Sequence, residues 1–117
     1  MGSARPGPQI DPEQNLCTVI VTVDADAGLI PELEAHARLG LEQFPAYDGF
    51  VAGALHESAD GTRLVQYLQW RSAADHQACI EDPRWESEPS STSFLDHVKA
   101  GRATIDVRTY QVVAKAR

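Results

Sequence analysis

A strand, a tight turn, a second strand and the start of a helix follow one another between Gly49 and Gln77, and this segment limits what the chain can fold into. Side chains of the run 50–57 alternate between two faces, and those of the run 63–70 do the same. The intervening Asp60-Gly61 pair accepts the positive φ that a hairpin turn requires. Ser72, followed three residues later by Asp75, is typical of a helix N-cap. The segment therefore predicts a β-hairpin that leads directly into a helix.

The two faces of this hairpin carry different side chains. Strict alternation predicts that one face holds Phe50, Ala52, Ala54, His56, Leu64, Gln66, Leu68 and Trp70. The other face then holds Val51, Gly53, Leu55, Glu57, Val65, Tyr67 and Gln69.

The rest of the chain supplies the elements that such a hairpin needs as neighbours. We expect an extended or disordered arm at 1–15, a strand at 16–23, a helix from about Pro31 to Pro45, the hairpin, a helix from Ser72 to about Asp82, a loop at 84–90, a helix at 91–100 and a strand at 104–114. Residues 16–117 then form one α+β domain with the ferredoxin-like, split βαβ order and one extra helical segment. That arrangement is a four-stranded antiparallel sheet with its helices on one face.

Composition places the chain among globular proteins of one domain. It has 117 residues, of which 43% are hydrophobic and 23% charged. No apolar run approaches the roughly 20 residues of a membrane span, and the start of the chain lacks the apolar core of a signal peptide, so we expect a cytoplasmic protein. A net charge of −7 argues against nucleic acid or an anionic membrane as a partner. Cys17 and Cys79 lie within apolar elements and are expected to be buried, reduced thiols.

One face of the predicted sheet has no helix to cover it. Val51, Leu55, Val65, Tyr67 and the second face of the first strand are too apolar to remain in water, and no further element of the chain is left over. A second copy of the same sheet, packed face to face, would bury them. The sequence thus predicts a homodimer.

Residues 45–83, PAYDGFVAGALHESADGTRLVQYLQWRSAADHQACIEDP, carry a family resemblance. They resemble the antibiotic biosynthesis monooxygenases, which form dimeric α/β barrels and show a Pro and a Gly before a Phe-containing strand, an Asp-Gly hairpin, a strand that ends in Trp, and Ser with an acidic residue opening a helix. The resemblance covers about residues 16–84 and the strand order beyond. It is greatest to the cofactor-independent, quinone-forming enzymes of actinomycete aromatic-polyketide pathways, whose third strand is similar to VQYLQW.

This resemblance implies a ligand cleft on the helix-facing side of the hairpin. There Trp70 would stack on a flat polycycle or donate to one of its oxygens, although a strand-end Trp is also a common core residue. Gln66 stands where the relatives carry an asparagine and would orient an oxygen function. His76 would act as the base, unless it lies on the helix surface. Phe50, Ala52, Ala54, Leu64 and Leu68 would form the substrate-binding surface.

The remaining histidines receive weaker assignments. His56 is either a second base at the mouth of the cleft or, more commonly for a strand end, exposed to solvent. His36 and His97 stand among charged helix positions and are expected at the surface. No HxH, HExxH or GxGxxG motif occurs, so we expect no metal and no nucleotide cofactor. Haem degradation is disfavoured because no further histidine follows His76 in its helix.

Three functions fit these observations. The resemblance implies a monooxygenase that oxidises a phenolic or anthrone-type polyketide intermediate to a quinone, with O₂ as co-substrate and no cofactor. A non-oxidative polyketide cyclase or isomerase would need only the histidines and an aromatic pocket. A small-molecule binding protein of the same fold is the third possibility.

Overall fold

The computed structural model describes residues 7–116, apart from the side chains at positions 86, 89 and 90. Its helices and strands are β1 (Cys17–Ala25), α1 (Ile30–Gln43), β2 (Phe50–Glu57), β3 (Arg63–Trp70), α2 (Ala73–Glu81), α3 (Pro83–Ser87), α4 (Pro89–Lys99) and β4 (Ala103–Tyr110). Short 3₁₀ helices precede β1 at Pro12–Gln14 and follow α1 at Phe44–Ala46. Residues 1–6 of the predicted arm lie outside the described part.

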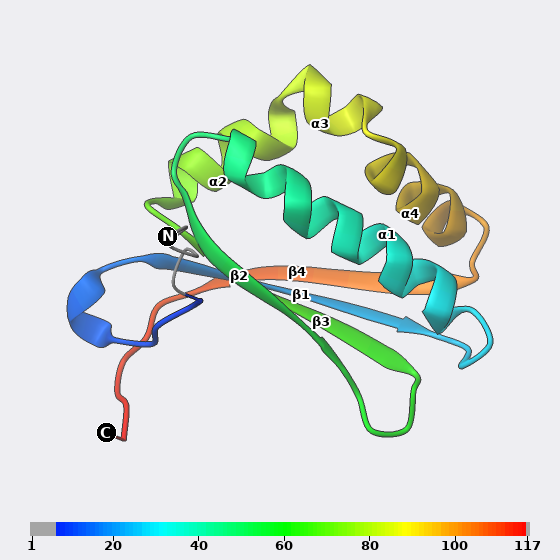
Figure 1. The fold of residues 1–117 in the computed structure, drawn as a ribbon, viewed down its shortest axis with the longest axis horizontal. Coiled ribbons are helices and arrows are strands. Elements are labelled where there is room, and N and C mark those ends of the chain that lie inside the picture. Colours follow the sequence, from blue (N-terminus) through cyan, green and yellow to red (C-terminus); the bar gives the residue numbers. More distant parts are fainter. Residues whose placement is uncertain (1–6, 117) are drawn as a thin grey trace, which may run out of the picture.

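The strands form one antiparallel sheet with the order β2-β3-β1-β4. Figure 1 shows α1, α2, α3 and α4 together on one side of this sheet, and no described α-helix lies on the other side. The predicted ferredoxin-like α+β arrangement is confirmed. On the helix side, Val19, Val21 and Val23 of β1 pair with Leu68, Gln66 and Leu64 of β3.

The register of β2 differs from strict alternation. Phe50 pairs with Trp70, but Ala52 pairs with Gln69, because the register shifts between Phe50 and Ala52. A bulge of this kind inserts one residue and reverses the face of every side chain beyond it. Leu55, which alternation placed on the open face, therefore faces the helices and packs with Leu64. The predicted face assignment of β2 is wrong from Ala52 onward.

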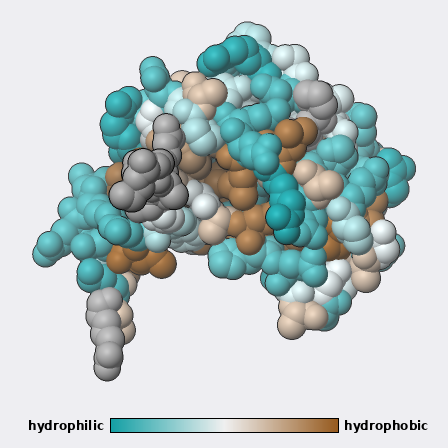
Figure 2. Space-filling model, viewed as in Figure 1, coloured by the Kyte–Doolittle hydropathy of each residue, from teal (hydrophilic) through white to brown (hydrophobic). Residues whose placement is uncertain are grey.

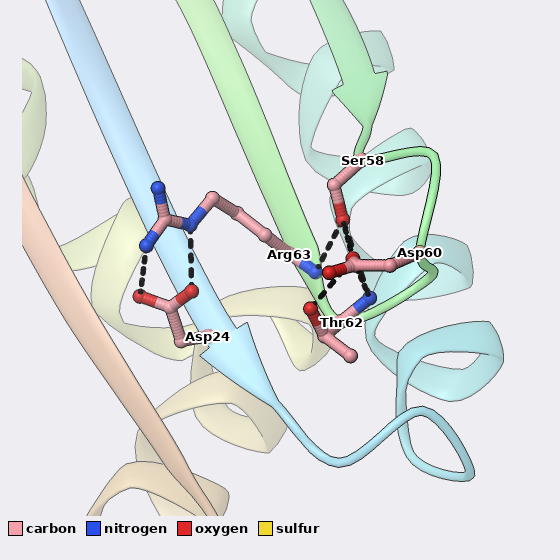
Figure 3. A network of polar contacts seen from close by, with 5 residues as sticks. All are labelled: Asp24, Ser58, Asp60, Thr62 and Arg63. Carbon is pink, nitrogen blue, oxygen red and sulfur yellow. Dashed lines mark hydrogen bonds and ion pairs between the residues drawn. The ribbon is translucent and has the colours of Figure 1, made fainter.

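The turn between β2 and β3 forms as the Asp-Gly pair predicts. Gly61 has φ +72°, and the Asp60 carboxylate accepts hydrogen bonds from the hydroxyls of Ser58 and Thr62, both at 2.7 Å. Beside the turn, Arg63 of β3 binds Asp24 of β1 with its Nε at 2.6 Å from the carboxylate (Figure 3). These contacts tie the hairpin end to the neighbouring strand.

The helices begin where their caps predict, with two corrections toward the C-terminus. Ser72 Oγ accepts from the Asp75 N–H at 3.1 Å and begins α2. The predicted loop at 84–90 is instead occupied by α3 and the first residues of α4, because the Asp82 side chain accepts from the Arg84 N–H and Pro83 occupies the first turn. The last strand ends at Tyr110 rather than at 114.

Two apolar clusters form the core between the sheet and the helices. One contains Val19, Phe44, Tyr47, Leu68, Trp70 and Cys79, and the other contains Val23, Ile30, Leu33, Leu64 and Ala103. On the open side of the sheet, the described part of the arm contributes a hydrogen bond of 2.6 Å from Gln69 Nε2 to the Gln9 carbonyl. The arm also reaches the C-terminal segment, where Lys115 Nζ lies 3.3 Å from the Asp11 carboxylate.

Apolar residues reach the surface where the two layers meet. Figure 2 shows them gathered between α1 and the sheet, with polar residues around them. Within residues 7–116, no helix is both long enough and apolar enough to cross a membrane.

Replacing Gly49 with alanine should destabilise the fold, because Gly49 has φ +84° and an added Cβ would collide with the Asp75 carboxylate at the start of α2. We expect a loss of about 2–4 kcal/mol, combining left-handed strain with the displacement of Asp75 from Arg71 and Ser72. Urea unfolding measures this. Gly61→Ala is the matched control: its φ is also positive, but nothing lies within 4 Å, so only about 1–2 kcal/mol should be lost. Equal losses in the two variants would contradict the collision at Asp75.

Candidate functional site

A cavity of about 310 Å³ lies between the sheet and the helical layer. Each of the four helices and three of the strands contribute to its wall, which consists of Val21, Val23, His36, Ala37, Gly40, Phe44, Leu64, Gln66, Leu68, His76, Ile80, Trp85, Ser91, Phe94, Leu95, Ile105 and Val107. Most of this wall is aliphatic or aromatic. Its volume is in the range of cavities that hold small organic ligands.

The polar side chains of the wall are few and come from different elements. They are His36 of α1, Gln66 of β3, His76 of α2 and Ser91 of α4. Gln66 Nε2 donates a long hydrogen bond of 3.5 Å to the Ala37 carbonyl, while its own side-chain oxygen accepts none from a described residue. Ser91 Oγ is buried and has no partner among the described residues. A ligand with oxygen functions could supply the partners that these groups lack.

His76 is the titratable group that burial affects most clearly at this site. Its side chain is 8% exposed, and neither ring nitrogen hydrogen-bonds to a described residue. Burial lowers the pKa of His76 below its usual 6.5, because the imidazolium form would lose its hydration. The ring is therefore neutral near pH 7 and can accept a proton. This is the state that a general base requires.

Trp70 lies behind the cavity wall rather than in it. The indole is 0% exposed and is enclosed by Phe44, Phe50 and His76, with ring centroids 5.8, 5.3 and 5.6 Å away. Phe44 and His76 line the cavity, and Trp70 does not. The prediction that Trp70 contacts the ligand directly is thus not met by this arrangement. Its Nε1–H is buried without a partner among the described residues.

The other predicted site residues divide into two groups. Gln66, Leu64 and Leu68 of β3 line the cavity, as does His76. Phe50 faces the helices but packs on Trp70 and Phe44 outside the cavity wall. Ala52, Ala54 and His56 were predicted on the cleft side, and this placement is wrong. The bulge after Phe50 turns them to the open face, where they pair with Gln69, Tyr67 and Val65.

His36, Trp85 and Ser91 are among the wall residues that sequence reasoning did not predict. His36 was expected at the surface, but α1 is rotated so that it faces the cavity beside Ala37. Trp85 and Ser91 were in or next to the predicted loop, and α3 and α4 bring them to the wall, with the Trp85 ring stacked on Phe44 at 4.7 Å. The Asp82-Pro83 pair was a usable signal, because Asp before Pro is a common start of a helix.

The described residues contain no cluster of three or more His, Cys, Asp or Glu side chains that could hold a metal ion. Cys79 is buried, and burial raises the pKa of its thiol to about 12, which leaves it protonated and unreactive. Cys17 is a free thiol whose pKa is also raised by burial. The chemistry available at the cavity is therefore that of histidine, amide and hydroxyl groups.

The fold and cavity together define an α+β domain that encloses a small, largely apolar cavity beside a neutral histidine. Among curated proteins, tetracenomycin-F1 monooxygenase of Streptomyces glaucescens is 36% identical over 80 residues, which cover 64% of this chain and 68% of that protein. No family model matches the sequence.

Solved structures show the same fold. SnoaB of Streptomyces nogalater, a cofactor-independent oxygenase solved in a mutant form, has a TM-score of 0.71 at 16% identity and covers 86% of this chain and 96% of its own. A proposed antibiotic biosynthesis monooxygenase of Nitrosomonas europaea has a TM-score of 0.65 at 18% identity and covers 87% and 94%. Together with the curated relative, these structures identify the family of the chain. The chain belongs to the antibiotic biosynthesis monooxygenase family, and it is a monooxygenase.

Because His76 is buried, the free energy of unfolding should depend on pH. Because the pKa of His76 is lowered in the folded chain, the unfolded chain takes up a proton at this residue first as the pH falls. The free energy of unfolding should therefore fall as the pH drops from about 6.5 through the lower folded pKa. Urea unfolding of wild type and His76→Leu at pH 7.5 and at pH 5 measures this. The variant should lose less stability than wild type between these two pH values, and an identical loss would show that His76 is not buried as a neutral ring.

Proposed function

We propose that this protein is a cofactor-independent monooxygenase that oxidises a phenolic or anthrone-type polycyclic aromatic compound to a quinone with O₂. The observation that carries the proposal is His76, a desolvated histidine without a hydrogen-bond partner in the wall of an apolar cavity. The names of tetracenomycin-F1 monooxygenase and of SnoaB support the reaction class. A cytoplasmic location stays a prediction.

The cavity suits a flat aromatic substrate. Its volume of about 310 Å³ accommodates a molecule of several fused rings, and Phe44, Trp85 and Phe94 offer aromatic surfaces to such rings. The few polar groups restrict where the oxygen functions of the substrate can lie. Apolar walls also exclude water, which strengthens each remaining electrostatic interaction.

The first step is removal of a proton. Neutral His76 accepts the acidic proton of the bound phenol or anthrone, and the substrate becomes an electron-rich anion. Gln66 is placed to stabilise that anion, because its side-chain amide reaches from the sheet into the same cavity. Trp70 acts as a positioning residue in this scheme, since its ring packs directly on His76.

The second step is the reaction with O₂, and the anion itself is the reductant. One electron passes from the anion to O₂, and the resulting superoxide and substrate radical combine to form a C–O bond as a peroxide. Loss of water from the protonated peroxide leaves the new carbonyl. One oxygen atom of O₂ enters the quinone and the other leaves as water. The four electrons that this requires all come from the substrate, in an anthrone from the methylene carbon that becomes the new carbonyl, so no cofactor is needed.

The open face of the sheet supports the homodimer that the proposal includes. Ile20 and Thr22 of β1 and Val65, Tyr67 and Ala54 of the hairpin form this face, and each is only half-buried by the described chain. Within residues 7–116, no α-helix covers them (Figure 1). Face-to-face packing of two such sheets would bury these side chains and leave each cavity on the outer, helical side.

An anthrone should be oxidised to its anthraquinone by the purified protein without added flavin or metal. An oxygen electrode and product absorbance measure the reaction, with one O₂ consumed per quinone formed. In Gln66→Leu, kcat should fall by roughly 10²-fold, because the amide that stabilises the anion is lost.

The matched control is Gln77→Leu, which removes an exposed amide from α2 outside the cavity wall and should keep the wild-type rate. Conversion of a polyketide substrate without oxygen uptake would instead indicate the cyclase. Binding without turnover of any kind would indicate a binding protein.

The dimer should dissociate when a charge is placed on the open face. Sedimentation velocity at micromolar concentration should show a dimer for wild type and a monomer for Val65→Arg, because the interface would have to bury two guanidinium groups. Leu39→Arg, on the outer side of α1 at 39% exposure, should remain dimeric. A wild-type protein that sediments as a monomer would refute the dimer without bearing on the oxygenase reaction.

A further inference from the structure

The cavity wall carries a second histidine that the reaction scheme above does not use. His36 lies on α1 between the small residues Ala35 and Ala37, is half-buried and lines the cavity. Its ring nitrogens make no hydrogen bond to a described residue. A half-buried imidazole without a partner beside an apolar cavity is a natural contact for an oxygen function of the ligand.

His36 and His76 stand at different places along the cavity. Phe44 and His76 lie at the same end of the cavity, because both rings pack on Trp70. Their ring centroids are 5.8 and 5.6 Å from that of Trp70. Phe44 directly follows α1, and His36 precedes it by eight residues, which corresponds to about 12 Å along a helix. The two imidazoles therefore border the cavity at different points, His76 near the C-terminal end of α1 and His36 about two helical turns earlier.

The surroundings of His36 are apolar on the α4 side. Gln43 of α1 contacts Glu88 at 2.7 Å, and Glu32 near the other end of α1 contacts His97 at 3.0 Å, so α4 runs antiparallel to α1. In this register Phe94 falls opposite His36, and both line the cavity. The imidazole is thus a polar group without a partner in this part of the wall, next to Gln66, whose amide already donates to the Ala37 carbonyl.

We infer that His36 is a ligand-contacting residue that selects substrates with a hydroxyl on an outer ring, away from the edge that His76 deprotonates. This inference rests on the proposed function and adds a specificity to it. His76 receives the acidic edge of the polycycle, where the proton is removed. His36 forms a hydrogen bond with a hydroxyl on an outer ring of the same molecule.

A pair of anthrones that differ by one hydroxyl tests this directly. Chrysophanol anthrone carries its oxygens along one edge, and emodin anthrone adds a single hydroxyl on an outer ring, away from that edge. Their dissociation constants are measured by calorimetry under argon, so that no oxidation occurs. Wild type should bind emodin anthrone about 5-fold more tightly, the effect of one neutral hydrogen bond.

Variants assign the preference to a residue. In His36→Leu the affinity for emodin anthrone should fall to that for chrysophanol anthrone, whose own affinity stays unchanged. His36→Gln, which keeps a donor and an acceptor, should retain part of the preference. Arg38→Gln is the control on the same helix: Arg38 is exposed and pairs with Glu34, so the wild-type preference should persist.

The outcomes separate this inference from the function on which it rests. A wild-type protein that binds both anthrones equally, or a His36→Leu variant that keeps the full preference, overturns the role of His36 and leaves the monooxygenase standing. If wild type binds neither anthrone, both proposals fail. Far-ultraviolet circular dichroism of each variant confirms that it is folded before binding is measured.

Discussion

The packing of aromatic rings around Trp70 holds together the end of the domain where the chemistry is proposed. Phe44 follows α1, Phe50 begins β2, Trp70 ends β3, and His76 lies in α2, so one cluster joins four segments. The same packing removes water from His76 and disfavours its charged form. A side chain that serves the core thereby sets the protonation state of a side chain that faces the ligand.

The sequence could predict the elements whose determinants are local. Alternation in β3 placed Leu64, Gln66 and Leu68 correctly, and the Ser72 cap and the Asp60-Gly61 turn fixed the ends of α2 and the hairpin. In each case the decisive interaction is within a few residues along the chain. Such interactions are readable because they do not depend on how the helices pack on the sheet.

The errors lie where tertiary packing decides. Phe50 stacks on Phe44 and meets Trp70, and the one residue inserted after it turns Ala52, Ala54 and His56 away from the cavity. His36 was missed for a similar reason. On a helix each residue turns about 100°, so a modest rotation of α1 moves a side chain from water to the cavity wall. Neither the bulge in β2 nor the rotation of α1 can be read from the residues next to these positions.

Three buried polar atoms have no hydrogen-bond partner among the described residues: Trp70 Nε1, Ser91 Oγ and the Tyr67 hydroxyl. Each such atom costs about 1–3 kcal/mol if it stays unpaired, which is a large share of the stability of a small domain. Ser91 lines the cavity, and Tyr67 lies on the open face of the sheet, paired with Ala54 and Ile20. The proposed substrate would be the partner on the first side, and the proposed homodimer would bring a second copy of the chain to the second. Two of the three unpaired atoms thus belong to residues on the two surfaces for which the apolar side chains independently indicate an occupant, whereas Trp70 Nε1 lies in the core behind the cavity wall.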